Sequence, residues 1–190
     1  MPSLVEVTAA DIEALLPELE AIYKDIHAHP ERSMVEFRTA SMAADRIEKL
    51  GYEVSRNVGK TGVVGVLRNG EGATVMLRAD MDALPVTEAT GLPYASQVKA
   101  KDEDGIEVGV AHACGHDLHV TWLLGAAQLL AKHRDAWKGT VLVVFQPGEE
   151  VGRGARSMMD DGMATRFPKP DIILGQHVMV GAACTVGYRS

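Results

Sequence analysis

The sequence predicts an α/β domain in which helices are layered on a mixed sheet. Short apolar segments, typical of buried strands, alternate along the chain with longer segments whose apolar residues recur at helical spacing. The first strand-like segments follow one another closely, with glycine turns between them, so hairpins and therefore antiparallel pairs are expected. Hydrophobic residues make up 46% of the 190 residues, which is enough for a packed core and excludes a disordered chain.

Four segments are expected to be helical. Residues 11–28 carry apolar side chains at helical spacing, and Pro30 ends the segment. A second helix is expected over about residues 33–50, with Ser33 as its N-cap and Gly51 at its end. The two later helices are predicted at residues 120–137 and at residues 151–162, where Gly162 closes the helix.

Strands are expected between these helices. The segment Val141–Phe145 is the strongest prediction, because it is apolar on both faces, as a central strand should be. Residues 86–110 are polar and predict a loop, and no internal repeat or low-complexity linker divides the chain. The other predicted strands are residues 52–57 and 61–70, Val75–Leu77, and a further buried strand at Ile172–Leu174.

Composition excludes several classes of protein. The formal net charge is −7 and no cluster of Lys and Arg stands out, which argues against a nucleic-acid surface. The N-terminal residues are acidic and lack the plan of a signal peptide, and the apolar runs are shorter than a membrane span. The two cysteines, Cys114 and Cys184, make no disulfide framework, so a reducing cytoplasm is expected.

Polar residues follow three of the predicted strands. Ligands of layered α/β domains bind where strands end, so these residues are expected to share one edge of the sheet. Cys114 and His116, in the stretch HACGHDLH just before a predicted helix, could face the same edge. The strand-end residues are Asp80 and Asp82, Glu149 and Glu150, and His177. The two aspartates could instead cap a turn before Pro85.

The pair Cys114 and His116 suits a metal ion. A thiolate sulfur and an imidazole nitrogen, completed by carboxylates, form a donor set for Zn²⁺, Mn²⁺, Co²⁺ or Ni²⁺. Structural zinc sites usually recruit their ligands in paired Cys and His motifs, so a single pair with carboxylates favours a catalytic site. A buried cysteine beside Asp117 as a helix cap is the structural alternative.

The adjacent acids Glu149 and Glu150 need compensation if both lie in a cleft, because like charges repel. A metal ion supplies it: one glutamate can bind the metal while the other takes a proton from water. A solvated helix N-terminus, where the helix dipole favours acids, would also explain the pair.

The remaining histidines leave alternatives open. His177 follows aliphatic residues, so it is either a metal ligand or a histidine of the core. His119 lies on the helix that follows the motif and could share its metal-facing side, support a ligand, or lie at the surface. His112 could reach substrate or solvent, and His27 and His29 flank a helix end, which favours structural roles.

Several stretches, taken in order, give the sequence a specific resemblance. They are IHAHPERSMVE, TGVVGVL, LRADMDALPVTEATGLPYAS, AHACGHDLHVTWLLGAAQLL, VLVVFQPGEEVGRGARSMMDDG and DIILGQHV. Together they resemble the metal-dependent amidohydrolases that include hippurate hydrolase, indole-acetyl-amino-acid hydrolases and N-acyl-amino-acid deacetylases, within the wider aminoacylase and carboxypeptidase-like metallopeptidases. The resemblance implies a three-layer helix–sheet–helix catalytic domain of the zinc-exopeptidase type, with a mixed, mostly parallel sheet.

The resemblance further implies a site for two divalent metal ions, which would be Mn, Zn, Co or Ni. Glu149 would act as general base and then as general acid in the hydrolysis of an N-acyl or N-aroyl amino acid. The wider metallopeptidases carry His-x-Asp where this chain has Asp80, Met81 and Asp82, so the cysteine motif would replace the first ligand there. The implied ligands are Cys114, His116, Glu150 and His177, and the implied supporting residues, which fix ligand orientation, are Asp82, Asp117 and Asp80.

The resemblance also implies what the chain is part of. Members of the family are longer, with an inserted lid domain often used for dimerisation and a return segment that supplies a further histidine. Residues 1–190 would therefore be the N-terminal portion of the catalytic domain, without the lid and the C-terminal segment, and the full-length form a homo-oligomer. One alternative is a non-catalytic metal-binding or interaction module derived from such an enzyme. Another is a hydrolase with Cys114 as nucleophile and His116 as base, which leaves the two glutamates unused.

Overall fold

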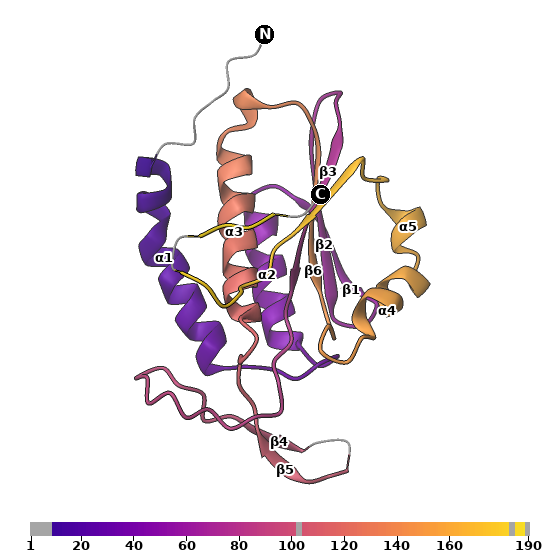
Figure 1. Cartoon of the computed structure of the whole chain (residues 1–190). Coiled ribbons are helices and arrows are strands. Elements are labelled where there is room, and N and C mark those ends of the chain that lie inside the picture. Colours follow the sequence, from indigo (N-terminus) through magenta and orange to yellow (C-terminus); the bar gives the residue numbers. More distant parts are fainter. Residues whose placement is uncertain (1–8, 102–103, 183–184, 189–190) are drawn as a thin grey trace.

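The computed structural model describes residues 9–101, 104–182 and 185–188, so Cys184 lies outside the described residues. A five-stranded sheet forms the middle layer, in the order β1-β2-β6-β3-β7. Three long helices cover one face and two short helices the other (Figure 1). The strands are β1 (Glu53–Val58), β2 (Gly62–Asn69), β3 (Thr74–Asp80), β6 (Gly139–Gln146) and β7 (Ile172–Gly175). The helices are α1 (Ala9–Ala28), α2 (Phe37–Lys49) and α3 (His116–Lys132) on one face, and α4 (Gly154–Asp160) and α5 (Met163–Arg166) on the other.

The sheet is mixed, as predicted. Strand β2 pairs antiparallel with both β1 and β6, whereas β3 pairs parallel with both β6 and β7. Parallel pairing therefore accounts for two of the four pairings and is confined to the half formed by β6, β3 and β7. That half determines where a site can form, because the C-terminal ends of its three strands lie at one edge.

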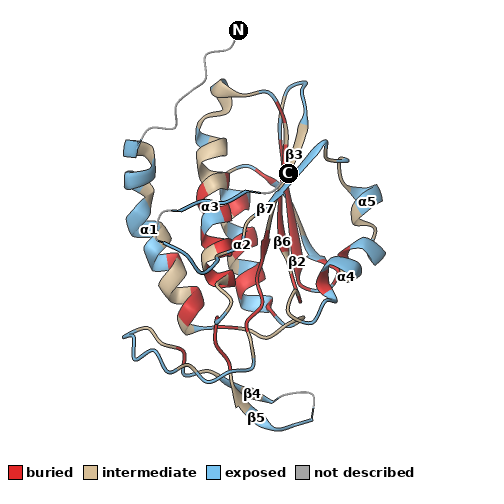
Figure 2. Ribbon diagram, viewed as in Figure 1, coloured by how far each residue is buried: buried red, intermediate tan, exposed pale blue. Residues whose placement is uncertain are grey.

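Two apolar cores hold the layers together. The larger lies between the sheet and helices α1, α2 and α3, and it includes the fully buried Ile26, Ile47 and Phe145. The smaller packs Met158 of α4 against Val144 and other residues of β2 and β6. Figure 2 shows the buried residues concentrated in the central strands and on the helix faces turned toward them. None of the described helices is long and apolar enough to cross a membrane.

The structure corrects three local predictions. Helix α2 begins at Phe37 rather than after Ser33, whose hydroxyl instead donates to Asp82 at 2.6 Å. Residues 86–110, predicted as a loop, include a short hairpin formed by β4 (Lys99–Lys101) and β5 (Glu107–Gly109). Helix α3 begins within the HACGHDLH stretch, at His116, so the last residues of that motif form its first turn.

Strand β7 was also predicted to be buried, and that was wrong. It lies at the edge of the sheet beside β3, and Ile172, Ile173 and Leu174 are 51%, 60% and 54% exposed. A run of aliphatic residues has the same pattern at an edge as in the centre of a sheet, because the sequence does not record which neighbours cover it.

Replacing Phe145 by alanine should lower the free energy of unfolding by about 3–5 kcal/mol, because it empties a fully buried position of the larger core. Denaturant unfolding followed by circular dichroism gives this quantity. Phe37→Ala is the matched control, since that ring is 56% exposed and its loss should cost less than about 1 kcal/mol. Equal losses for the two variants would contradict the described core.

Candidate metal centre

The ends of three parallel strands bring polar side chains together. Strand β3 ends at Asp80, β6 leads through a short loop to Glu149 and Glu150, and β7 is followed by His177. Because these strands run parallel, their C-terminal ends share one edge of the sheet, where the N-terminus of α3 also lies (Figure 1). The convergence expected from the sequence is therefore present in the fold.

His116 lies at the centre of this group. Its side chain is fully buried, and its Nδ1 lies 2.8 Å from the backbone oxygen of Asp82. A carbonyl oxygen only accepts, so Nδ1 carries a proton, and in the neutral ring Nε2 keeps a lone pair. Among the described residues Nε2 has no hydrogen-bond partner, although Glu149 Oε2 and Glu150 Oε1 each lie 3.8 Å away. Such separations are too long for hydrogen bonds but suit ligands of one ion, since bonds of ~2.0–2.2 Å allow ligands up to ~4 Å apart.

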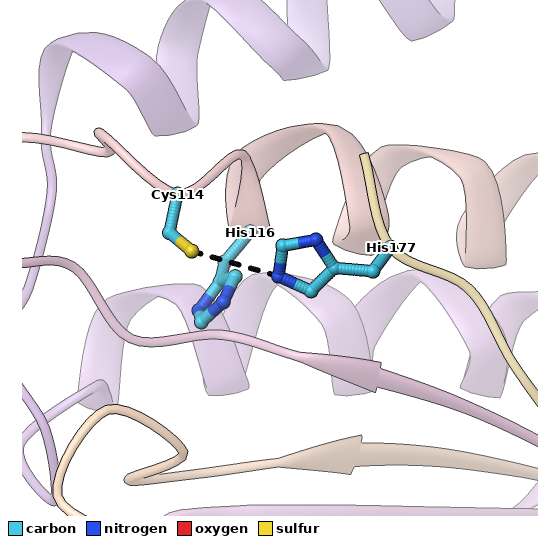
Figure 3. A group of neighbouring side chains, drawn as sticks. All are labelled: Cys114, His116 and His177. Atoms are coloured by element: carbon cyan, nitrogen blue, oxygen red, sulfur yellow. Dashed lines mark hydrogen bonds between the residues drawn. The ribbon is translucent and has the colours of Figure 1, made fainter. Parts of the chain in front are cut away.

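Cys114 and His177 face each other beside His116 (Figure 3). Cys114 Sγ and His177 Nε2 are 3.5 Å apart. His177 Nδ1 donates to the backbone oxygen of Val178 at 2.7 Å, so in the neutral ring its Nε2 also keeps a lone pair. In their neutral form the two histidines offer an unprotonated Nε2 while a backbone carbonyl holds the other nitrogen, which is the usual arrangement of metal-binding histidines.

The surroundings of Cys114 favour the protonated thiol over the thiolate. Burial and the nearby carboxylates of Glu150 and Glu149 raise its pKa to about 11. A thiol with so high a pKa is a poor nucleophile, and its hydrogen-bond contact is with His177, so the geometry disfavours a cysteine hydrolase with His116 as base. A cation would stabilise the thiolate instead. The buried Glu150 Oε1 also lacks a hydrogen-bond partner among the described residues, which likewise indicates a place for a cation.

Besides a set with Asp80 and His119, two possible donor sets share His116. One joins it to Cys114 and His177, and the other joins it to Glu149 and Glu150. Within each set the ligand atoms all lie within 4.8 Å of one another. Nε2 of His116 binds one ion at a time, so these donors fit a pair of ions only if the other members of the two sets hold the second.

Comparison with known proteins assigns the family. Residues 76–188 match the model of a protein family described as Peptidase family M20/M25/M40. The chain belongs to this family. It is 44% identical over 170 residues to hippurate hydrolase of Campylobacter jejuni, with 89% of this chain and 41% of that protein covered. It is 38% identical over 190 residues to N-acetyl-L-cysteine deacetylase of Bacillus subtilis, with 97% and 42% covered.

A solved structure supports the same assignment for this M20 chain. This chain superposes on the Bacillus subtilis YXEP protein, a dinuclear metal binding peptidase from the M20 family, with a TM-score of 0.75 and 36% sequence identity. The match covers 87% of this chain and 43% of that chain. The resemblance inferred from the motifs is thereby confirmed, and the M20 chain spans about two-fifths of the length of the relatives it matches.

In the M20 chain, Asp82 holds the loop that carries the two glutamates. Its Oδ1 accepts the amide of Glu149 and its Oδ2 the amide of Glu150, both at 3.0 Å. Burial opposes ionisation of Asp82, but the adjacent ring of His116, the hydroxyl of Ser33 and the two amides lower its pKa to about 2. One carboxylate thus fixes the loop, while the backbone oxygen of the same residue fixes the ring of His116.

Glu36 is a residue of this region that sequence reasoning missed. It is fully buried, and its Oε1 accepts the amides of Gly148 at 2.8 Å and of Met34 at 2.7 Å. Its Oε2 accepts the hydroxyl of Thr61 at 2.5 Å, and burial raises its pKa in spite of these donors. Glu36 therefore anchors the residue before Glu149. An acid just ahead of a helix is common for other reasons, so the sequence carried no signal that would single it out.

The other two predicted supporting residues make different contacts. Asp80 accepts a hydrogen bond from His119 at 2.6 Å on one oxygen and from Arg78 at 2.6 Å on the other. Asp117 pairs with His27 of α1 at 2.7 Å. Asp80 is therefore tied to the strand that carries it and to α3, whereas Asp117 ties α3 to α1, and His27 has the structural role expected of it.

A cavity of about 450 Å³ lies beside the donors. Cys114 and His177 line it together with Tyr23, His112 and Val178. His112 is buried, neither ring nitrogen has a hydrogen-bond partner among the described residues, and burial lowers its pKa to about 4. A cavity of this size falls in the range of small-molecule sites, so a ligand next to Cys114 and His177 has room to extend.

Replacing Asp82 by asparagine should lower the free energy of unfolding by about 1–3 kcal/mol in the presence of a chelator, because an amide group would face the backbone N–H groups of Glu149 and Glu150. Ser33→Ala, which removes a single donor to Asp82, should cost about 1 kcal/mol. Measuring chelator-treated protein separates this loss of stability from any effect on metal binding. An unchanged denaturation midpoint for Asp82→Asn would show that Asp82 does not hold the loop.

Proposed function

We propose that this chain forms the metal-binding part of an amidohydrolase that cleaves the amide bond of N-acyl or N-aroyl amino acids. The products are a carboxylic acid and an amino acid. The observation that carries the proposal is the meeting of one thiol, two imidazoles and two carboxylates at one sheet edge, with His116 Nε2 and Glu150 Oε1 buried without protein partners. The names of the relatives, hippurate hydrolase and N-acetyl-L-cysteine deacetylase, support the substrate class.

The proposed ligands are Cys114, His116, Glu150 and His177, and they would hold two divalent cations of Mn, Zn, Co or Ni. When bound, such cations lower the pKa of water and polarise a carbonyl group. The tautomers support these roles, because a carbonyl holds Nδ1 of each histidine and leaves Nε2 toward the donors. Asp82 would keep Glu150 and His116 in place, and Asp80 and Asp117 would support α3.

Glu149 is the proposed general base. Its side chain is 40% exposed and that of Glu150 19%, so Glu149 is the better placed of the two to reach a substrate. It would take a proton from the attacking water and then deliver that proton to the leaving nitrogen of the amide. Because Asp82 holds the backbone amides of both glutamates, the base and the neighbouring ligand would keep a fixed spacing during this transfer.

The chain would correspond to the N-terminal portion of the catalytic domain. We propose that a lid and a further catalytic segment belong to the rest of the enzyme, that the lid joins copies into a homo-oligomer, and that the enzyme works in the cytoplasm. The coverage of about two-fifths of each relative supports the first of these points. If the complete protein bound metal without hydrolysing acyl amino acids, a non-catalytic metal-binding module would replace the enzyme.

Replacing Glu149 by glutamine in the complete protein should lower kcat by at least about 100-fold, because the amide cannot accept the proton from water. Release of glycine from hippurate measures turnover, and elemental analysis measures bound metal, which should be unchanged. Glu71→Gln, at an exposed position, is the control and should keep the wild-type rate. Normal turnover by the Glu149→Gln variant would disprove the assigned base.

A further inference from the structure

His119 is a fully buried histidine that the proposed mechanism leaves without a role. It lies in the first turn of α3, and its ring and its backbone oxygen both contact the segment after β7. The backbone N–H of Val178 donates to His119 Nε2 at 3.0 Å, and the side-chain amide of Gln176 donates to the His119 carbonyl at 3.3 Å. The two residues that flank His177 in sequence are therefore both bound to one residue of α3.

The hydrogen bonds of His119 fix its tautomer. An amide N–H can only donate, so Nε2 must be the accepting nitrogen and Nδ1 carries the proton. Nδ1 lies 2.6 Å from Asp80 Oδ1, and the other oxygen of Asp80 is bound to Arg78. Both nitrogens are thus in use. Although His119 lies close enough to Asp80 and His116 to form a third donor set, it has no lone pair to offer an ion.

The same segment also fits tightly against the residue between Cys114 and His116. Gly115 has a φ of +83°, and a Cβ at that position would lie 2.4 Å from Val178 Cγ2. Only glycine allows this approach, so Val178 is packed against Gly115 and hydrogen-bonded to His119 at once. The consequence is visible in Figure 3, where the imidazole of His177 turns toward the thiol of Cys114.

We infer that His119 is a positioning residue: it holds residues 176–178 so that His177 Nε2 faces Cys114. The inference rests on the proposed function only in taking His177 to be a ligand. His119 acts through Val178 and Gln176 and receives its own orientation from Asp80. It also explains why a buried histidine stands one helical turn after His116, where the ring centroids are 5.4 Å apart, without joining the donor set.

Three substitutions separate the contacts of His119. His119→Gln keeps a carbonyl oxygen near the position of Nε2, so it can still accept the amide of Val178. His119→Asn keeps a donor near the position of Nδ1, so it can satisfy Asp80 but not Val178. His119→Ala keeps neither, and His29→Ala, at an exposed histidine, is the matched control.

The first measurement needs no metal. Hydrogen exchange of the Val178 amide, followed by NMR on the chelator-treated chain, should be at least about 10-fold faster in His119→Ala and His119→Asn than in the wild type. In His119→Gln and His29→Ala it should stay within about 3-fold. Nitrogen chemical shifts of the wild-type ring should show Nδ1 protonated and Nε2 unprotonated. A protonated Nε2, or equal exchange in all variants, would overturn the inference.

The second measurement uses Co²⁺ as a probe of the centre. Affinity for Co²⁺ should fall about 10- to 100-fold in His119→Ala and His119→Asn, as is typical when a residue supporting a ligand is lost, and His119→Gln should recover most of it. The visible spectrum of bound Co²⁺ should shift in the first two variants only. If His119→Gln binds as poorly as His119→Ala, His119 is itself a ligand and the inference fails. If the wild-type chain binds no Co²⁺, the proposed metal site fails, and the amide exchange still decides the role of His119.

Discussion

The carboxylate of Asp82 is the interaction on which the rest of the site depends. It accepts the amides of both glutamates and the hydroxyl of Ser33, and its own backbone oxygen orients His116. Burying a carboxylate costs free energy unless hydrogen-bond donors surround it. Asp82 can therefore stay buried only when the segments that carry its donors come together. The end of β3 thereby joins the loop after β6 to the start of α3.

Two further buried acids extend the same scheme. Glu36 binds the amide that precedes the glutamate pair, and Asp80 binds the histidine that holds the segment after β7. Each of the three acids meets backbone or ring N–H groups of another element, which gives directional contacts where apolar packing would give only proximity. Rigid support of this kind suits a centre whose donors come from remote parts of the chain, since small displacements would change the ligand geometry.

The sequence predicted the layered fold and the meeting of Asp80, Glu149, Glu150 and His177, because buried parallel strands have a recognisable pattern and must end at one edge. It did not predict the roles of Glu36 or His119. The role of Glu36 depends on a hydrogen bond with Gly148, which lies 112 positions away in sequence, and that of His119 on a hydrogen bond with Val178, 59 positions away. Contacts between such distant residues leave no periodic pattern in the sequence. Ser33 was misassigned for the same reason, since a helix cap and a distant aspartate are equally good partners for a hydroxyl.

The uncovered aliphatic side chains of Ile172, Ile173 and Leu174 have a consequence for handling the isolated chain. They lie on a strand that has a described neighbour on one side only, so backbone donors and acceptors along the outer side are free to bind another extended peptide. The formal net charge of −7 opposes such association at low salt, but screening weakens that repulsion at higher ionic strength. Concentrated, salt-rich solutions therefore favour edge-to-edge aggregation through β7.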